Sequence, residues 1–78
     1  MYNHTFDSMV SIINKIGSSS LSISSHVGWS SGLDQIATIS FMYKEPKNII
    51  TVKDCNQKTV DEIESEIRSG MDEIDSEV

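Results

Sequence analysis

Acidic side chains are the most numerous chemical groups in the last quarter of the sequence. Residues 61–78 contain eight carboxylates and one base, Arg68, so this segment carries a charge of −7. The four acids and five bases of residues 1–60 sum to +1. The carboxylates are Asp61, Glu62, Glu64, Glu66, Asp72, Glu73, Asp75 and Glu77. A row of carboxylates on one helix either keeps a small protein hydrated or imitates a phosphate backbone and binds a basic protein surface.

The same carboxylates do not predict acid–base catalysis. Two carboxyl groups take opposite roles only where their surroundings push their pKa values apart, and a solvent-facing row offers no such difference. His26 is expected on the polar face of a strand, as a surface side chain and not as a base. We therefore expect no catalytic residue and no enzyme activity.

One short motif resembles a catalytic one. Residues 28–32 read Gly-Trp-Ser-Ser-Gly and fit the G-x-S-x-G pattern of the hydrolase nucleophile elbow. That motif needs a strand before it, a helix after it, and an acid and then a histidine later in the chain. Here both histidines precede Ser30 and a strand is expected next. We interpret the segment as a turn.

Metal and disulfide chemistry are also not predicted. Cys55 is the only cysteine, so no disulfide can form within the chain. A structural zinc site needs about four ligands at short paired spacings, whereas the candidates here are His4, His26 and Cys55. We expect no metal and no cofactor, and Cys55 to be an incidental thiol in a loop.

The composition is that of one small globular domain. The 78 residues are 37% apolar and 23% charged, with a net charge of −6. A chain of this length supports a single thin core. No apolar run approaches the roughly 18 residues of a membrane span, and the first residues do not resemble a secretion signal. We expect a cytoplasmic protein. The acidic balance argues against direct binding of nucleic acid, which requires positive charge.

The first element is predicted to be a helix over residues 5–16. Apolar residues recur there at steps of three and four, which is the spacing of one helical face. Thr5 or Asn3 can cap its start, and Gly17 can end it in a left-handed conformation. The residues expected on its buried stripe are Phe6, Met9, Val10, Ile13 and Ile16.

Three strands are expected next, because the period changes to two. From Leu21 to Trp29 one face is apolar, and Ser25 breaks this pattern, which indicates either a bulge or an exposed stretch. Residues 35–43 are partly apolar on both faces, which is typical of a central strand. Residues 44–48 predict a hairpin loop because they contain Pro46, and residues 49–53 predict a third strand. Trp29 and Tyr43 are expected in the core and not at an interface.

The last element is predicted to be a second amphipathic helix that starts at a capping box, Thr59 to Glu62. Gly70 lies inside it and costs about 1 kcal/mol relative to alanine. A bend or a separate terminal helix is therefore expected near Gly70. The stripe expected to be buried is Val60, Ile63, Ile67, Met71, Ile74 and Val78.

These elements predict a two-layer α+β domain over residues 1–78. The order is helix, strand, strand, strand, helix, with an antiparallel meander sheet and both helices on one face. The order resembles that of the double-stranded RNA-binding domain in topology. That family depends on lysines at the start of its last helix, where this chain has Asp61, Glu62 and Glu64. RNA binding is therefore not expected.

Two functional hypotheses follow. In its order of elements and its acidity, the chain resembles small inhibitors made by phages and mobile elements, including some anti-CRISPR proteins. The first hypothesis is therefore a non-enzymatic inhibitor or adaptor, in the host cytoplasm if phage-encoded, that binds a basic surface of a nucleic-acid-handling partner through its acidic helix. The second is a structural or assembly protein that forms homodimers. It would use the heptad-spaced residues Val60, Ile67 and Ile74, or a sheet face with Ile36 and Met42.

Overall fold

The protein has the predicted α+β architecture. The computed structural model describes residues 2–28 and 35–77. Its elements, in order, are α1 (Phe6–Ile16), β1 (Leu21–Gly28), β2 (Ile36–Tyr43), β3 (Glu45–Val52), the short 3-10 helix η1 (Cys55–Gln57) and α2 (Val60–Ser76). The strands form one antiparallel sheet in the order β1-β2-β3, so β2 is central, as predicted.

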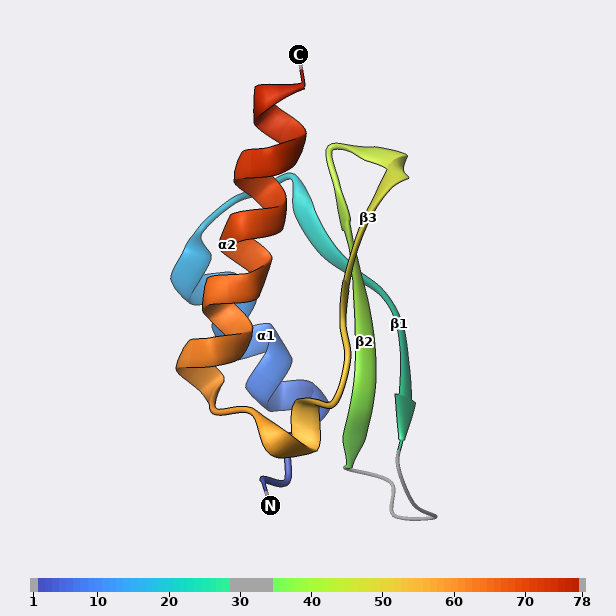
Figure 1. Ribbon diagram of the computed structural model, residues 1–78, viewed down its shortest axis with the longest axis vertical. Helices are drawn as coiled ribbons and strands as arrows, with labels where there is room; N and C mark the ends of the chain where they lie inside the picture. Colours follow the sequence, from blue (N-terminus) through green and yellow to red (C-terminus); the bar gives the residue numbers. More distant parts are fainter. Residues whose placement is uncertain (1, 29–34, 78) are drawn as a thin grey trace.

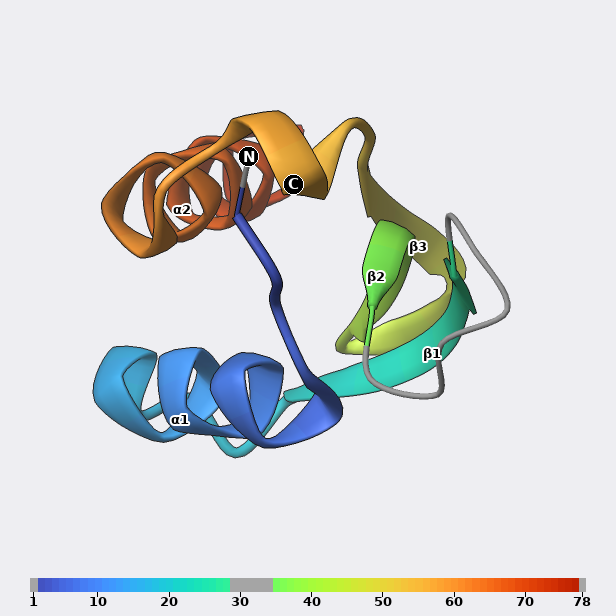
Figure 2. The same cartoon turned by 90° about the horizontal axis from the view of Figure 1, so that it is seen from below.

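Both helices lie on the same face of the sheet (Figures 1 and 2). The core between the two layers is made of apolar side chains from every element. Its buried members are Met9, Ile12, Leu21, Ile36, Ile39, Phe41, Tyr43, Ile50, Val52, Cys55, Ile63 and Ile67. Cys55 is therefore a core residue and not the incidental loop thiol expected from the sequence. Burial raises the pKa of its thiol, which keeps it protonated at neutral pH.

Helix α1 has the predicted ends but a rotated buried face. The Thr5 side chain caps the Ser8 backbone N–H, and Gly17 ends the helix with φ of 77°. Phe6, predicted to be buried, is 48% exposed, and the predicted stripe omitted Ile12, which is buried. Both arrangements have helical spacing, so periodicity alone could not choose the face that meets the sheet.

A bulge in β1 reverses its faces. Ile23 pairs with Phe41 but Ser25 pairs with Ser40, so one extra residue lies in β1, and of the two interpretations of Ser25 the bulge is the correct one. Beyond it, His26 lies on the helix side, with its ring 5.8 Å from that of Phe6, and Val27 is 63% exposed. The prediction that Val27 belongs to the apolar face and His26 to the polar face is therefore wrong. Trp29 and the G-x-S-x-G turn lie outside the described residues.

A second register shift buries the start of β2. Val27 pairs with Thr38 and Gly28 with Ile36, so the extra residue now lies in β2. Ile36 consequently packs in the core and is only 3% exposed. Strand alternation alone had placed it on the opposite face from Ile39.

The hairpin between β2 and β3 is tighter than predicted. The turn is Lys44, with φ of 66°, and β3 already begins at Glu45. The predicted loop of residues 44–48 corresponds to a register irregularity, because Tyr43 pairs with Glu45 whereas Met42 pairs with Ile49. From Ile49 to Val52 the pairing with β2 is uninterrupted.

Helix α2 runs without interruption through Gly70, so the predicted bend is wrong. Its predicted capping box between Thr59 and Glu62 is present. A Cβ atom on Gly70 would lie 2.9 Å from Cγ2 and 3.0 Å from Cγ1 of Ile50. The glycine therefore allows a close approach of α2 to β3.

The N-terminal segment, residues 2–5, covers one end of the core (Figure 2). Backbone hydrogen bonds join Tyr2 to Asn56 and His4 to Ile36, with N···O distances of 2.7 and 3.0 Å. The His4 ring is buried, and its Nε2 atom lies 2.6 Å from the carbonyl oxygen of Lys58. His4 thus has a structural partner that sequence reasoning did not identify.

We predict that Gly70→Ala lowers the free energy of unfolding by about 1 kcal/mol. Alanine gains about 1 kcal/mol of helix propensity, but overpacking against Ile50 typically costs 1–3 kcal/mol. Urea unfolding followed by circular dichroism measures the difference. Ser69→Ala, at the exposed neighbouring position, is the matched control and is expected to stabilise slightly. A Gly70→Ala variant more stable than the wild type would contradict the close contact.

Candidate functional site

The acidic residues of α2 lie on two flanks of the helix and not in a single row. Successive residues turn by about 100°, so the apolar face toward the core separates two sets of carboxylates. Ionic contacts and helical spacing place one set on the side of α1 and of the hairpin turn. The inner flank comprises Asp61, Glu64, Asp72 and Asp75, and the outer flank, beside β3, comprises Glu62, Glu66, Glu73 and Glu77.

The inner flank is largely neutralised within the molecule. Glu64 forms ion pairs with Lys15 of α1, at 3.3 Å, and with Arg68, at 2.9 Å. Its side chain is only 14% exposed. Asp75 accepts hydrogen bonds from the Tyr43 hydroxyl and from Lys44, which attach the C-terminal half of α2 to the hairpin. Three cations therefore oppose the four acids of this flank.

The outer flank has fewer compensating contacts. The Glu62 side chain accepts a hydrogen bond from the Thr59 backbone N–H in the capping box, and Glu66 forms an ion pair with Lys58 at 2.7 Å. Glu73 and Glu77 have no side-chain hydrogen bond or ion pair among residues 2–28 and 35–77. They are four residues apart near the end of the helix, where both their mutual repulsion and the negative end of the helix dipole are unfavourable.

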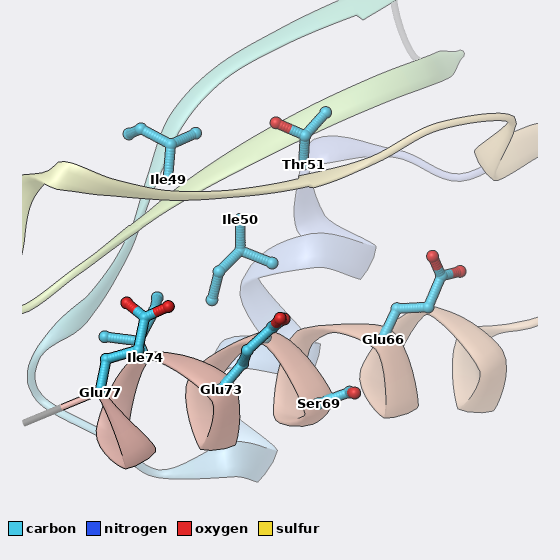
Figure 3. A pocket seen from close by; sticks show the side chains of 9 residues that line it. Ile49, Ile50, Thr51, Glu66, Ser69, Glu73, Ile74 and Glu77 are labelled. Carbon is cyan, nitrogen blue, oxygen red and sulfur yellow. The ribbon is translucent and has the colours of Figure 1, made fainter.

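A groove lies between the outer flank and β3. It has a volume of about 460 Å³, and Figure 3 shows carboxylate side chains of α2 rising toward the strand. Ile50 points from β3 toward α2, while Ile49 and Thr51 point to the other side. The lining residues are Ile49, Ile50, Thr51, Glu66, Ser69, Gly70, Glu73, Ile74 and Glu77.

The ion pairs also change acid strength. The hydrogen bond from Lys44 lowers the pKa of Asp75, with a smaller effect from Tyr43. Arg68, and then Lys15, lower the pKa of Glu64. The backbone N–H of Thr59 lowers the pKa of Glu62. Contacts with other residues of the same chain favour the ionised form of these three carboxylates, so their charges stabilise the folded state.

The structure separates the eight predicted binding residues by what they contact. It brings Glu66, Glu73 and Glu77 together along the groove and places Asp61 and Asp72 on the inner flank by helical spacing. Sequence reasoning missed the lysines that partner α2: Lys15 and Lys44 come from distant segments, and Lys58, although it directly precedes α2, is eight residues from Glu66 and outside the helix. Only the Arg68–Glu64 pair, at i and i+4, carries a sequence signal.

The residues predicted for self-association differ in exposure. Ile67 is fully buried and Ile36 is 3% exposed, because α2 uses part of its apolar stripe to cover its own sheet. Val60 is 42% exposed. Met42 is partly exposed on the sheet face opposite the helices, where it pairs with Ile49, which is 46% exposed.

Other chemistry is not assembled in the described part of the chain. No group of three or more metal-ligating side chains comes together among residues 2–28 and 35–77. In the same residues, neither helix combines the length and the apolar character that crossing a membrane requires.

Comparison with protein-family models, with curated proteins and with solved structures finds no match for this chain.

We predict that Asp75→Asn flattens the pH dependence of stability. Because contacts in the folded protein lower the pKa of Asp75 below its ordinary 3.8, its charge stabilises the fold above that pH, and this contribution disappears as pH falls through the lowered pKa. The free energy of unfolding of the wild type should modestly exceed that of the variant at pH 7, because the pair is exposed, and the difference should close as pH falls through the lowered pKa of Asp75.

Urea unfolding at pH 7, 5, 3 and 2 measures the effect. Asp72→Asn is the matched control, because Asp72 has no ionic partner among the described residues. Parallel pH profiles for the two variants would show that the contact with Lys44 and Tyr43 does not stabilise the fold.

Proposed function

We propose that this protein is a non-enzymatic inhibitor or adaptor that binds a basic surface of a nucleic-acid-handling protein through the outer flank of α2. The observation that carries the proposal is the pair Glu73 and Glu77, which lie beside a groove and have no ionic partner among residues 2–28 and 35–77. Their repulsion and their position near the helix C-terminus cost stability, and a basic partner would relieve that cost.

The density of charge also supports imitation of a nucleic acid. Seventeen residues of α2 span about 25 Å at 1.5 Å per residue, and seven of the eight acids fall within them. Counted over both flanks, that is roughly one carboxylate per 3–4 Å, similar to the 3.4 Å spacing of phosphates along one DNA strand, and the outer flank alone has one per roughly 7 Å. Internal ion pairs reduce the net charge of the inner flank, so the outer flank is the proposed contact.

The location proposed for this activity is the cytoplasm, and that of the host if the chain is phage-encoded. Such an inhibitor would meet its nucleic-acid-handling partner there. Complementary charge would raise the association rate and make it sensitive to salt.

A capture experiment tests the proposal. Immobilised wild type is incubated with host lysate at about 50 mM salt, where charges are weakly screened. We expect nucleic-acid-binding proteins to be retained and to be released by short DNA duplex or by high salt. The Glu73→Gln/Glu77→Gln variant should no longer retain these proteins. The Asp61→Asn/Asp72→Asn variant, which also loses two negative charges, should still retain them. Equal retention by both variants would contradict the outer flank as the contact.

We also predict that Glu73→Gln/Glu77→Gln is more stable than wild type, by about 0.5 kcal/mol at low salt. The substitution removes one repulsive pair at i and i+4 and two negative charges near the helix C-terminus. Urea unfolding at 20 mM and at 1 M salt measures this gain, which should vanish at high salt. A loss of stability at low salt would mean that these carboxylates support the fold.

A further inference from the structure

The two edges of the sheet differ in how they are protected. The edge strand β1 is interrupted by a bulge at Ser24 and Ser25, and bulges hinder pairing with another strand. In β3, Pro46 lies in the irregular half next to the hairpin. From Ile49 to Val52 the strand is regularly paired with β2 on one side only. Half of its backbone groups there therefore point away from the sheet.

The free edge of β3 has few competing contacts. Among residues 2–28 and 35–77, no segment other than β2 forms a backbone hydrogen bond with Ile49, Ile50 or Thr51. Ile49 is 46% exposed. The groove beside α2 lies along these same residues. The edge is thus flanked by open space on the side of the helix.

The groove has the charge to select what pairs with this edge. Its rim carries Glu66, Glu73 and Glu77, and only Glu66 has a cationic partner, Lys58, in the described part of the chain. A second copy of this protein would bring its own acidic groove to the same place, and like charges oppose that arrangement. A segment bearing lysine or arginine would be attracted instead.

The spacing along α2 fits an extended chain. A strand added beside β3 presents alternate side chains to the helix side, at intervals of about 6.6–6.8 Å. Glu73 and Glu77 are four residues apart, a rise of about 6 Å along α2. Figure 3 shows α2 running alongside β3, and residues of both elements line the groove. Basic residues at two alternate positions of the added strand would therefore face Glu73 and Glu77, whereas Glu66 lies about 10.5 Å further along α2 and is outside this repeat.

We propose that an extended basic segment of the partner adds to the sheet at the free edge of β3, over Ile49–Thr51, and places alternating lysines or arginines against Glu73 and Glu77. Main-chain hydrogen bonds would hold the segment, and the carboxylates would select its sequence. This inference rests on the proposed function, because it specifies how the basic surface of the partner is recognised.

Synthetic peptides test this mode directly. Two labelled octapeptides of equal composition are compared by fluorescence anisotropy at 50 mM salt, one with lysine and threonine alternating and one with four lysines followed by four threonines. The alternating peptide should bind at least tenfold more tightly. Backbone N-methylation then distinguishes the two edges of the peptide. Methylating the amides of the lysines, or those of the threonines, should abolish binding in one case only, because one edge of the peptide pairs with β3.

Two protein variants complete the design. Glu73→Gln/Glu77→Gln should weaken binding of the alternating peptide at least tenfold, whereas Asp61→Asn/Asp72→Asn should leave it within about twofold. Amide chemical shifts of the wild type should change at residues 49–51 on binding.

Each outcome decides the inference. Equal affinity for the two lysine patterns, with no effect of methylation, would overturn strand addition and leave the proposed electrostatic contact standing. No binding of either peptide would also overturn it, while the lysate capture tests the function independently.

Discussion

The contact between Gly70 of α2 and Ile50 of β3 sets the distance between the helix and the sheet. With no side chain at Gly70, the helix can settle against the isoleucine, and Ile63 and Ile67 enter the core on the same face. The same approach brings the outer carboxylates beside the strand (Figure 3). The groove is therefore a product of helix–sheet packing, and a glycine that is unfavourable for the helix is favourable for this architecture.

Charge in this molecule is divided between structural and unpaired groups. Lys15 and Lys44 reach α2 from α1 and from the hairpin, and Lys58 reaches Glu66 from the segment just before α2. Among the described residues, two carboxylates on each flank have neither an ion pair nor a side-chain hydrogen bond: Asp61 and Asp72 on the inner flank, Glu73 and Glu77 on the outer flank. Only the outer pair lies beside the groove.

The sequence patterns predicted which segments are helices and strands better than they predicted which side of each element faces the core. Periodicity and caps located both helices and the central strand, because those signals are local. The face of α1 and the sides taken by His26 and Val27 depended on packing and on a bulge, whose effect on phase is not visible in a strand pattern. The partners of the carboxylates, and thus the groove, required the tertiary fold.

The N-terminal segment links parts of the chain that are far apart in sequence. His4 contacts Lys58 across 54 positions, and Tyr2 contacts Asn56, whereas the two hairpins of the sheet are local. Contacts of long separation raise the contact order and slow folding, because a large loop must close before they form. The meander can thus assemble from neighbours, while one end of the core stays uncovered until the first residues return to η1. The chain's beginning and its last third are in this sense a single folding unit.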